Sequence, residues 1–202
     1  MKWKLWEKSL LVALAVLLAL HLTGLSAAGS DIPSRVLRLH VLANSDSDAD
    51  QALKLKVRDR VLEVSADWME NAGTLSQAEA AARAHLPEIQ KAAEEVVREN
   101  GSGQSVRVTF EDVWFPTRQY ENVTLPAGVY RALRVVLGKG EGHNWWCVLF
   151  PSLCLPSSEP ETALSDVLTQ PELDLVTSPY RIRFQSIEWI ESVQRWFSSL
   201  CS

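Results

Sequence analysis

An uninterrupted apolar run near the N-terminus constrains this chain more than any other feature of its sequence. Every residue from 10 to 20 is Leu, Val or Ala, and Lys2, Lys4 and Lys8 precede the run. Residues 9–28 contain no charged side chain, which is long enough for a helix to span a bilayer. The overall hydrophobic content of 47% therefore includes residues that need not belong to a folded core.

The same segment has the three parts of a secretory signal: a basic start, an apolar run, and small residues before a cleavage point. Ser26 and Ala28 occupy the third and first positions before the cut, so the pattern predicts cleavage between Ala28 and Gly29. The alternative is an uncleaved membrane anchor. In both cases the basic end stays in the cytoplasm and the rest of the chain is exported. We therefore expect a signal peptide or an anchor over residues 1–28.

The charge of the exported part argues against polyanionic partners. Removal of residues 1–28 takes away three lysines and one glutamate and lowers the formal net charge from −5 to −7. An acidic surface repels a phosphate backbone and gains nothing from anionic lipid. We expect no nucleic acid partner, and contact with a membrane only through the N-terminal segment.

Hydrophobic periodicity predicts a single α+β domain over residues 29–155. Alternating apolar residues predict strands, which cover residues 35–42, 106–115, 129–137 and 145–150. Apolar residues three and four apart predict helices from residue 48 to 68 and from residue 76 to 99, with Pro87 interrupting or restarting the second. Gly138, Gly140 and Gly142 predict a tight hairpin between the last two strands. We expect an antiparallel sheet of about four strands with helices packed on one face.

Two further segments follow the core domain. Residues 156–179 contain no Lys or Arg, carry several acidic residues and prolines, and predict an irregular connection with room for a short helix at residues 163–168. Residues 180–202 carry apolar side chains at helical spacing and predict a C-terminal amphipathic helix. That helix either closes the core or offers a docking surface. The docking alternative rests on the two tryptophans within eight residues, which are more than a small core needs.

The polar segment after the first strand is predicted to start a helix. Asp48 with Gln51 has the spacing of a capping box. Asp46, Asp48 and Asp50 also repeat the first three ligands of an EF-hand, but Gln51 and Val57 stand where that loop needs Gly and Glu. The acidic residues are therefore expected to meet the free N–H groups of a helix N-terminus. We expect no metal and no cofactor.

The three cysteines are Cys147, Cys154 and Cys201. Cys147 and Cys154 are close in sequence with Pro151 between them, so they are the natural disulfide pair in an exported chain. The alternative is two buried free thiols. A catalytic role for Cys147, with His40 as its base, is disfavoured because Cys147 lies inside a predicted strand. A reactive thiolate is usually stabilised at a helix N-terminus.

Two blocks of sequence are more specific than these patterns. The first reads RLHVLANSDS at residues 38–47 and continues to Asp59, and the second reads GEGHNWWCVLFP at residues 140–151 and is followed by Cys154. Together, and in this order, they resemble the stage II sporulation protein R family. The likeness covers most of residues 34–155.

The resemblance implies an intercellular signal of endospore-forming bacteria. Members are made in the forespore and exported into the space between the two membranes. There they activate a membrane-embedded aspartic protease of the mother cell, which processes a pro-sigma factor. The chain would then be a signal and not an enzyme. The alternative is a secreted hydrolase acting on peptidoglycan or a propeptide, with Cys147 or an Asp as its catalytic group.

Six residues of the two blocks are candidates for binding that partner: His40, Asn44, Asp46, Asn144, Trp145 and Trp146. Asn44 and Asp46 have an equally good structural explanation as helix caps, and His40 as a hydrogen-bonded core residue. Adjacent residues of a strand point to opposite faces, so we expect one of Trp145 and Trp146 in the core. The other is expected to be exposed or covered by a helix.

Overall fold

The computed structural model describes residues 10, 12–14, 31–120, 122–153 and 160–177. Its elements are η1 (Ile32–Ser34), β1 (Leu37–Leu42), α2 (Asp48–Glu70), α3 (Leu75–Ala84), α4 (Leu86–Glu99), β2 (Val106–Phe115), β3 (Arg118–Tyr120), β4 (Val123–Leu125), β5 (Gly128–Leu137), β6 (Asn144–Phe150), α5 (Pro160–Ser165) and α6 (Gln170–Thr177). None of the helices in these ranges has both the length and the hydropathy that a membrane crossing requires. The predicted cleavage site at Ala28 and Gly29 and the helix predicted over residues 180–202 lie outside the described ranges.

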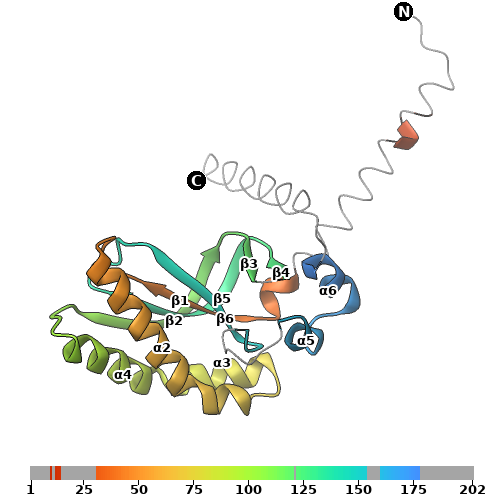
Figure 1. Cartoon of the computed structure of the whole chain (residues 1–202). Coiled ribbons are helices and arrows are strands. Elements are labelled where there is room, and N and C mark those ends of the chain that lie inside the picture. Colours follow the sequence, from red (N-terminus) through yellow and green to blue (C-terminus); the bar gives the residue numbers. More distant parts are fainter. Residues whose placement is uncertain (1–9, 11, 15–30, 121, 154–159, 178–202) are drawn as a thin grey trace, which may run out of the picture.

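The protein has an α+β fold built on a mixed sheet (Figure 1). Among the described residues the main sheet has the strand order β2-β5-β1-β6. β2 pairs antiparallel with β5, and β1 pairs antiparallel with β6, but β1 and β5 run parallel, with Arg38 opposite Ala132. The predicted α+β class is confirmed, whereas the prediction of a wholly antiparallel sheet is wrong. β2 forms one edge of the sheet and runs antiparallel to β1. β5 lies between these two strands and is antiparallel to β2, so it runs parallel to β1.

The glycine-rich segment between β5 and β6 is not the tight hairpin that the sequence predicted. β1 lies between β5 and β6 in the sheet, so these two strands do not pair. Residues 138–143 instead cross over the C-terminal end of β1, and we call this segment the arch. Gly138 and Gly140 adopt φ values of +56° and +67°, a conformation that glycine tolerates best. The glycine pattern correctly indicates a change of direction but not which strands it connects.

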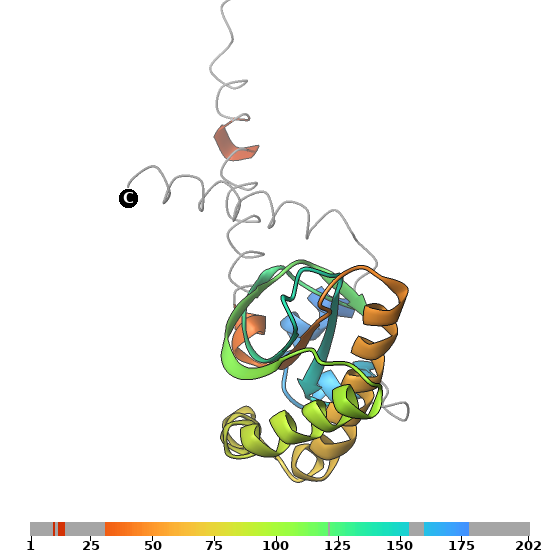
Figure 2. The same ribbon diagram turned by 90° about the vertical axis from the view of Figure 1, so that its left-hand side faces the viewer.

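Helices α2, α3 and α4 lie on one side of the main sheet (Figures 1 and 2). Leu53, Val57 and Val61 of the apolar stripe predicted for the first helix are buried, whereas Val64 and Trp68 are half-buried. These side chains pack with Leu39 and Val41 of β1 in one continuous core. Burial of each such side chain contributes about 1.5–3 kcal/mol, which fixes the helical layer on the sheet.

Local signals set the ends of these helices. The Ser47 hydroxyl, and not Asp48, caps α2 by accepting the Asp50 N–H at 3.2 Å. α3 ends at Ala84 and α4 begins at Leu86, with Pro87 in its first turn, so the proline restarts the helix. A proline fits there because first-turn N–H groups have no partner inside the helix.

The opposite face of the sheet is also covered, so the prediction of helices on one face only is wrong. In a second core on that face, residues of η1, β3, β4, α5 and α6 pack against sheet residues such as Phe115, Tyr130 and Val148. Although β1 alternates apolar with polar residues, Arg38 and His40 are both buried on this second face. A strand covered on both sides need not alternate apolar with polar residues.

The acidic segment of residues 156–179 contains α5 and α6 where we predicted an irregular connection. α5 overlaps the short helix that the sequence allowed at residues 163–168. Leu164, Leu175 and Val176 are buried in the second core. Prolines and acidic residues among these apolar side chains made their helical spacing hard to recognise in the sequence. Packing in the second core stabilises the helical conformation.

Candidate functional site at the corner and the arch

The segment that joins β1 to the first turn of α2, residues 43–50, lies directly against the arch, and we call this segment the corner. The Gly142 N–H donates to Ala43 O at 3.0 Å, and the Glu141 N–H donates to Asn44 O at 3.2 Å. The corner belongs to the first signature block and most of the arch to the second. The fold therefore joins two blocks that are far apart in the sequence into one surface, the corner–arch junction.

Asn44 is the centre of this junction. Its Oδ1 accepts the Lys139 N–H at 3.0 Å, and its Nδ2 donates to Asp50 Oδ2 at 2.9 Å. A Cβ on Gly138 would come within 2.2 Å of Asn44 Oδ1, so the arch can approach Asn44 only through a glycine. Asn44 thus connects the arch to the first turn of α2. This connection is additional to the helix-capping role considered for it.

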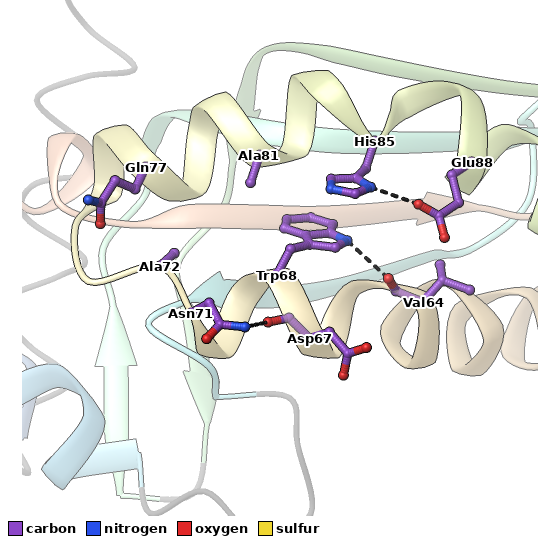
Figure 3. A pocket seen from close by; sticks show the side chains of 9 residues that line it. All are labelled: Val64, Asp67, Trp68, Asn71, Ala72, Gln77, Ala81, His85 and Glu88. Carbon is purple, nitrogen blue, oxygen red and sulfur yellow. Dashed lines mark hydrogen bonds and ion pairs between the residues drawn. The ribbon is translucent and has the colours of Figure 1, made fainter.

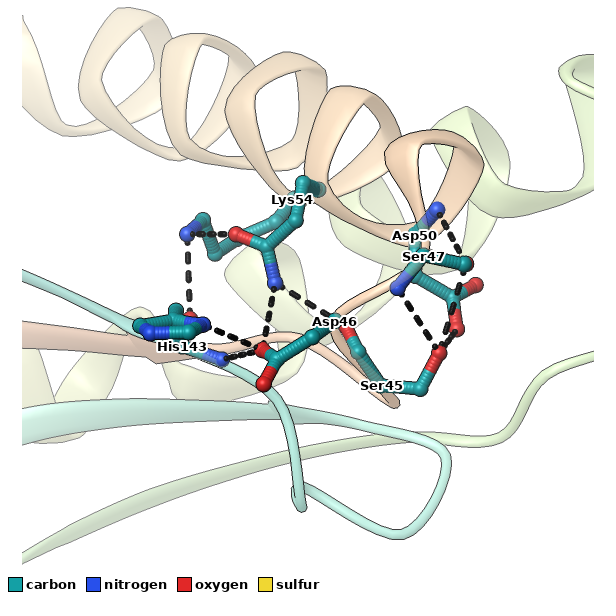
Figure 4. A network of polar contacts seen from close by, with 7 residues as sticks. Ser45, Asp46, Ser47, Asp50, Lys54 and His143 are labelled. Carbon is teal, nitrogen blue, oxygen red and sulfur yellow. Dashed lines mark hydrogen bonds and ion pairs between the residues drawn. The ribbon is translucent and has the colours of Figure 1, made fainter.

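Asp50 organises the start of α2, although the sequence did not single it out as a site residue. Ser45 Oγ donates to its carboxylate at 2.5 Å, and Asn44 and Gln104 also donate to it. These hydrogen bonds, led by that of Ser45, lower the pKa of Asp50 below its ordinary value. The carboxylate is held as an anion that orders the corner (Figure 4).

Asp46 and His143 form the exposed part of the junction (Figure 4). Asp46 Oδ1 accepts the His143 N–H and lies 2.5 Å from His143 Nδ1. The hydrogen bonds from His143 lower the pKa of Asp46. The side chains remain 55% and 79% exposed, respectively, so a partner can reach both.

Lys54 lies on the α2 side of the junction. It is buried, and its Nζ donates to Gln51 Oε1 at 2.6 Å and to His143 O at 3.0 Å. Burial lowers the pKa of this amine. Lys54 therefore connects the second turn of α2 to the end of the arch.

The two tryptophans of β6 point to opposite faces, as the strand pattern predicts. Trp145 packs on the helical side, where the Arg58 guanidinium lies 5.0 Å from the centre of its ring. Trp146 faces the second core and stacks on His40, with ring centroids 3.8 Å apart. Both rings are partly buried, and the neighbouring Asn144 is exposed.

His40 is a core residue rather than a surface contact. It is 4% exposed, and burial lowers its pKa to about 4, so its ring is neutral at physiological pH. A partner cannot reach it without displacing the second core. Of the six predicted contact residues, Asp46 and Asn144 are exposed, Asn44, Trp145 and Trp146 are partly buried, and His40 is buried.

Cys147 is buried in β6 and is disulfide-bonded. This observation excludes the free-thiol alternative for Cys147 and removes it as a thiolate nucleophile in this state. Cys154 and Cys201 lie outside the described residues, so the pairing of Cys147 with Cys154 stays a prediction. The described ranges contain no group of three or more His, Cys, Asp or Glu that could hold a metal ion.

The sequence signals and the site overlap only in part. The sequence predicts Asn44 and Asp46 as contact residues, but not Asp50, Lys54 and His143. All three lie within the two signature blocks, and this position is the sequence signal that could have identified them. What the junction can do chemically is to present fixed hydrogen-bond donors and acceptors to a partner.

Comparisons with known proteins agree with this geometry. The family model described as stage II sporulation protein R matches residues 33–159, which include both the corner and the arch. The stage II sporulation protein R of Bacillus subtilis (strain 168) is 46% identical over 123 residues, or 61% of this chain and 55% of that protein. The chain therefore spans little more than half the length of that relative. No solved structure matches the chain.

Proposed function

This chain belongs to the stage II sporulation protein R family, and from this membership we propose that it is an exported sporulation signal. In this proposal the forespore makes the chain and secretes it into the intermembrane space. There it activates the membrane-embedded aspartic protease of the mother cell, which processes a pro-sigma factor. The N-terminal segment, residues 1–28, directs the export and is either removed or kept as an anchor.

The observation that carries the proposal is the joining of the two signature blocks at the corner–arch junction. Backbone hydrogen bonds and the Asn44 side chain fix the arch on the corner. The junction leaves Asp46, His143 and Asn144 exposed at one end of the sheet. A surface that is ordered before binding loses little conformational entropy on association, which favours a protein partner.

The same surface supports a mechanism by differential affinity. The exported domain would bind the outward-facing part of the protease more tightly in its active state than in its inactive state. Binding then shifts the protease population toward the active state without any chemistry by this chain. The disulfide at Cys147 counts against the version of the hydrolase alternative that uses this residue as nucleophile.

The test combines the full-length chain with membranes that contain the candidate protease and its pro-sigma factor. We expect cleavage of the propeptide only when the chain is present. Asn144→Ala should lower the rate about tenfold, which corresponds to about 1.4 kcal/mol of binding free energy. The matched control is Lys91→Ala, an exposed position on α4 away from the junction, which should leave the rate unchanged.

Two outcomes would contradict the proposal in different ways. Cleavage at the same rate without the chain would show that the chain is not the activator. Full activity of both Asn144→Ala and Asp46→Ala, with normal folding, would leave the function intact but remove the corner–arch junction as the contact surface.

A further inference from the structure

A groove open to solvent lies between the C-terminal half of α2 and the junction of α3 with α4 (Figure 3). Its volume is about 480 Å³. Nine residues line it: Val64, Asp67, Trp68, Asn71, Ala72, Gln77, Ala81, His85 and Glu88. Val64 follows Asp50 by fourteen positions on α2, which at 1.5 Å per residue places the near end of the groove about 21 Å from the corner. The groove is therefore separate from the site proposed above.

The base of the groove is aromatic. The rings of Trp68 and His85 are parallel within 2°, with their centroids 5.4 Å apart. The indole N–H donates to Val64 O at 3.0 Å, so its hydrogen-bonding capacity is used within α2. Because His85 stacks on the indole and the indole also packs against the core, a ligand in the groove meets only the remaining exposed part of its π surface, which attracts cations.

The rim of the groove is acidic. Asp67 and Glu88 line it with their carboxylates, and no Lys or Arg is among the nine lining residues. Glu88 Oε2 lies 2.7 Å from His85 Nδ1, which fixes one carboxylate beside the aromatic pair. The Asp67 side chain has no hydrogen bond or ion pair with any residue that the structure describes, so its charge is available to a ligand.

We propose that this groove binds an arginine side chain of a partner protein. A guanidinium is planar, stacks on an indole and presents a fork of N–H donors to a carboxylate. Trp68 supplies the stacking surface, and Asp67 and Glu88 supply the carboxylates. Val64, Ala72 and Ala81 leave room for the apolar stem of the same side chain.

The experiment titrates the full-length, 15N-labelled chain, kept in a neutral detergent, with N-acetyl-L-arginine amide. The matched probe is N-acetyl-L-citrulline amide, which has nearly the same shape but no charge. We expect the indole signal of Trp68, assigned with Trp68→Phe, to shift saturably with the arginine probe and at least about fivefold more weakly with the citrulline probe. The double variant Asp67→Asn with Glu88→Gln should weaken arginine binding by a similar factor.

The controls separate a charged ligand from the other occupants of such a groove. The remaining indole signals of the double variant should match the wild type, because both changed residues are exposed. Equal shifts with the two probes would show an apolar site and overturn the proposal. So would unchanged arginine binding in the double variant. A Trp68 signal that moves with protein concentration alone would identify a second copy of the chain as the occupant, which also overturns it.

Discussion

Asn44 and Gly138 lie so close together that residue 138 has no space for a side chain. A Cβ on Gly138 would stand 2.2 Å from Asn44 Oδ1, and the φ of +56° at this glycine is itself unfavourable for other residues. Gly101 has a similar φ of +68° but open space around it. Comparing substitutions at the two glycines therefore separates the cost of a positive φ from the cost of crowding against Asn44.

Gly138→Ala should destabilise the protein more than Gly101→Ala. The positive φ costs about 1–2 kcal/mol at either position. At Gly138 the clash with Asn44 should add about 1–3 kcal/mol, as overpacking does elsewhere. Urea unfolding of both variants measures the two costs. Equal losses of unfolding free energy would show that the arch moves away from Asn44 freely.

Tyr120→Phe should lower the free energy of unfolding by about 1.5–3 kcal/mol, the range for hydrogen bonds to charged groups. Arg38 is fully buried, lies 4.0 Å from the centre of the Phe115 ring and donates from Nη2 to the Tyr120 hydroxyl. Removing that hydroxyl leaves a buried charged donor without this acceptor.

The control for that variant is Tyr130→Phe. The Tyr130 hydroxyl donates to the neutral Pro126 O at 2.7 Å, and the loss of that hydrogen bond should cost about 0.5–1.5 kcal/mol. Thermal unfolding of the two variants compares the effects. A larger loss for Tyr130→Phe than for Tyr120→Phe would contradict the role given to Arg38.

Stability should fall as the pH is lowered from 6.5 to 4 because of His40. Its pKa is about 4 in the folded protein and 6.5 in the unfolded chain. Between these values the unfolded chain binds more protons, so the free energy of unfolding rises with pH across this window and then levels off above it. The total effect of this group is about 3 kcal/mol.

His40→Phe keeps a ring stacked on Trp146 but removes the titrating group. The difference between the wild-type and variant unfolding free energies should therefore change between pH 4 and 6.5 and be constant outside that window. Carboxylates such as Asp50 act at lower pH, because their pKa values are lowered from 3.8. A difference curve that is flat across the window would exclude a buried neutral His40.

Asp46→Ala should lower signalling without unfolding the protein. Asp46 is exposed and its hydrogen bonds reach only His143 and Gln51 among the described residues. We expect little change in melting temperature and a clear loss of pro-sigma factor cleavage in the membrane assay. The exposed ion pair of Arg60 and Glu63 on α2 supplies the control, since Glu63→Ala removes a comparable surface carboxylate. If both variants lose activity equally, the effect is one of general surface charge.

Peptide mapping without reduction should recover Cys147 linked to Cys154. Cys147 is disulfide-bonded, and closing so short a loop stabilises a protein by about 2–3 kcal/mol on the chain-entropy model. Replacing Cys147 and Cys154 together by Ser should remove that stabilisation while leaving Cys201 unchanged. A peptide that joins Cys147 to Cys201 would contradict the pairing.

Local sequence determined the elements of this fold well. Alternation identified β1, β2, β5 and β6, and spacings of three and four identified α2 and its buried stripe of Leu53, Val57 and Val61. These patterns depend only on the geometry of a strand or a helix, which a short window of sequence contains. The signature blocks likewise identified the family before any contact was known.

Only the tertiary structure decided which strands are neighbours and where the site lies. Strand order depends on contacts between residues far apart in the chain, such as β1 with β5, and no local pattern records them. The same applies to Arg38 and His40, which are buried because the second core covers their face of the sheet. The sequence by itself determined the four strands of the main sheet, helices α2 to α4 and the two signature blocks, but not β3, β4 or α6. The insertion of β1 between β5 and β6 brought Asn44 under the arch, because the connection between those strands must cross the end of β1.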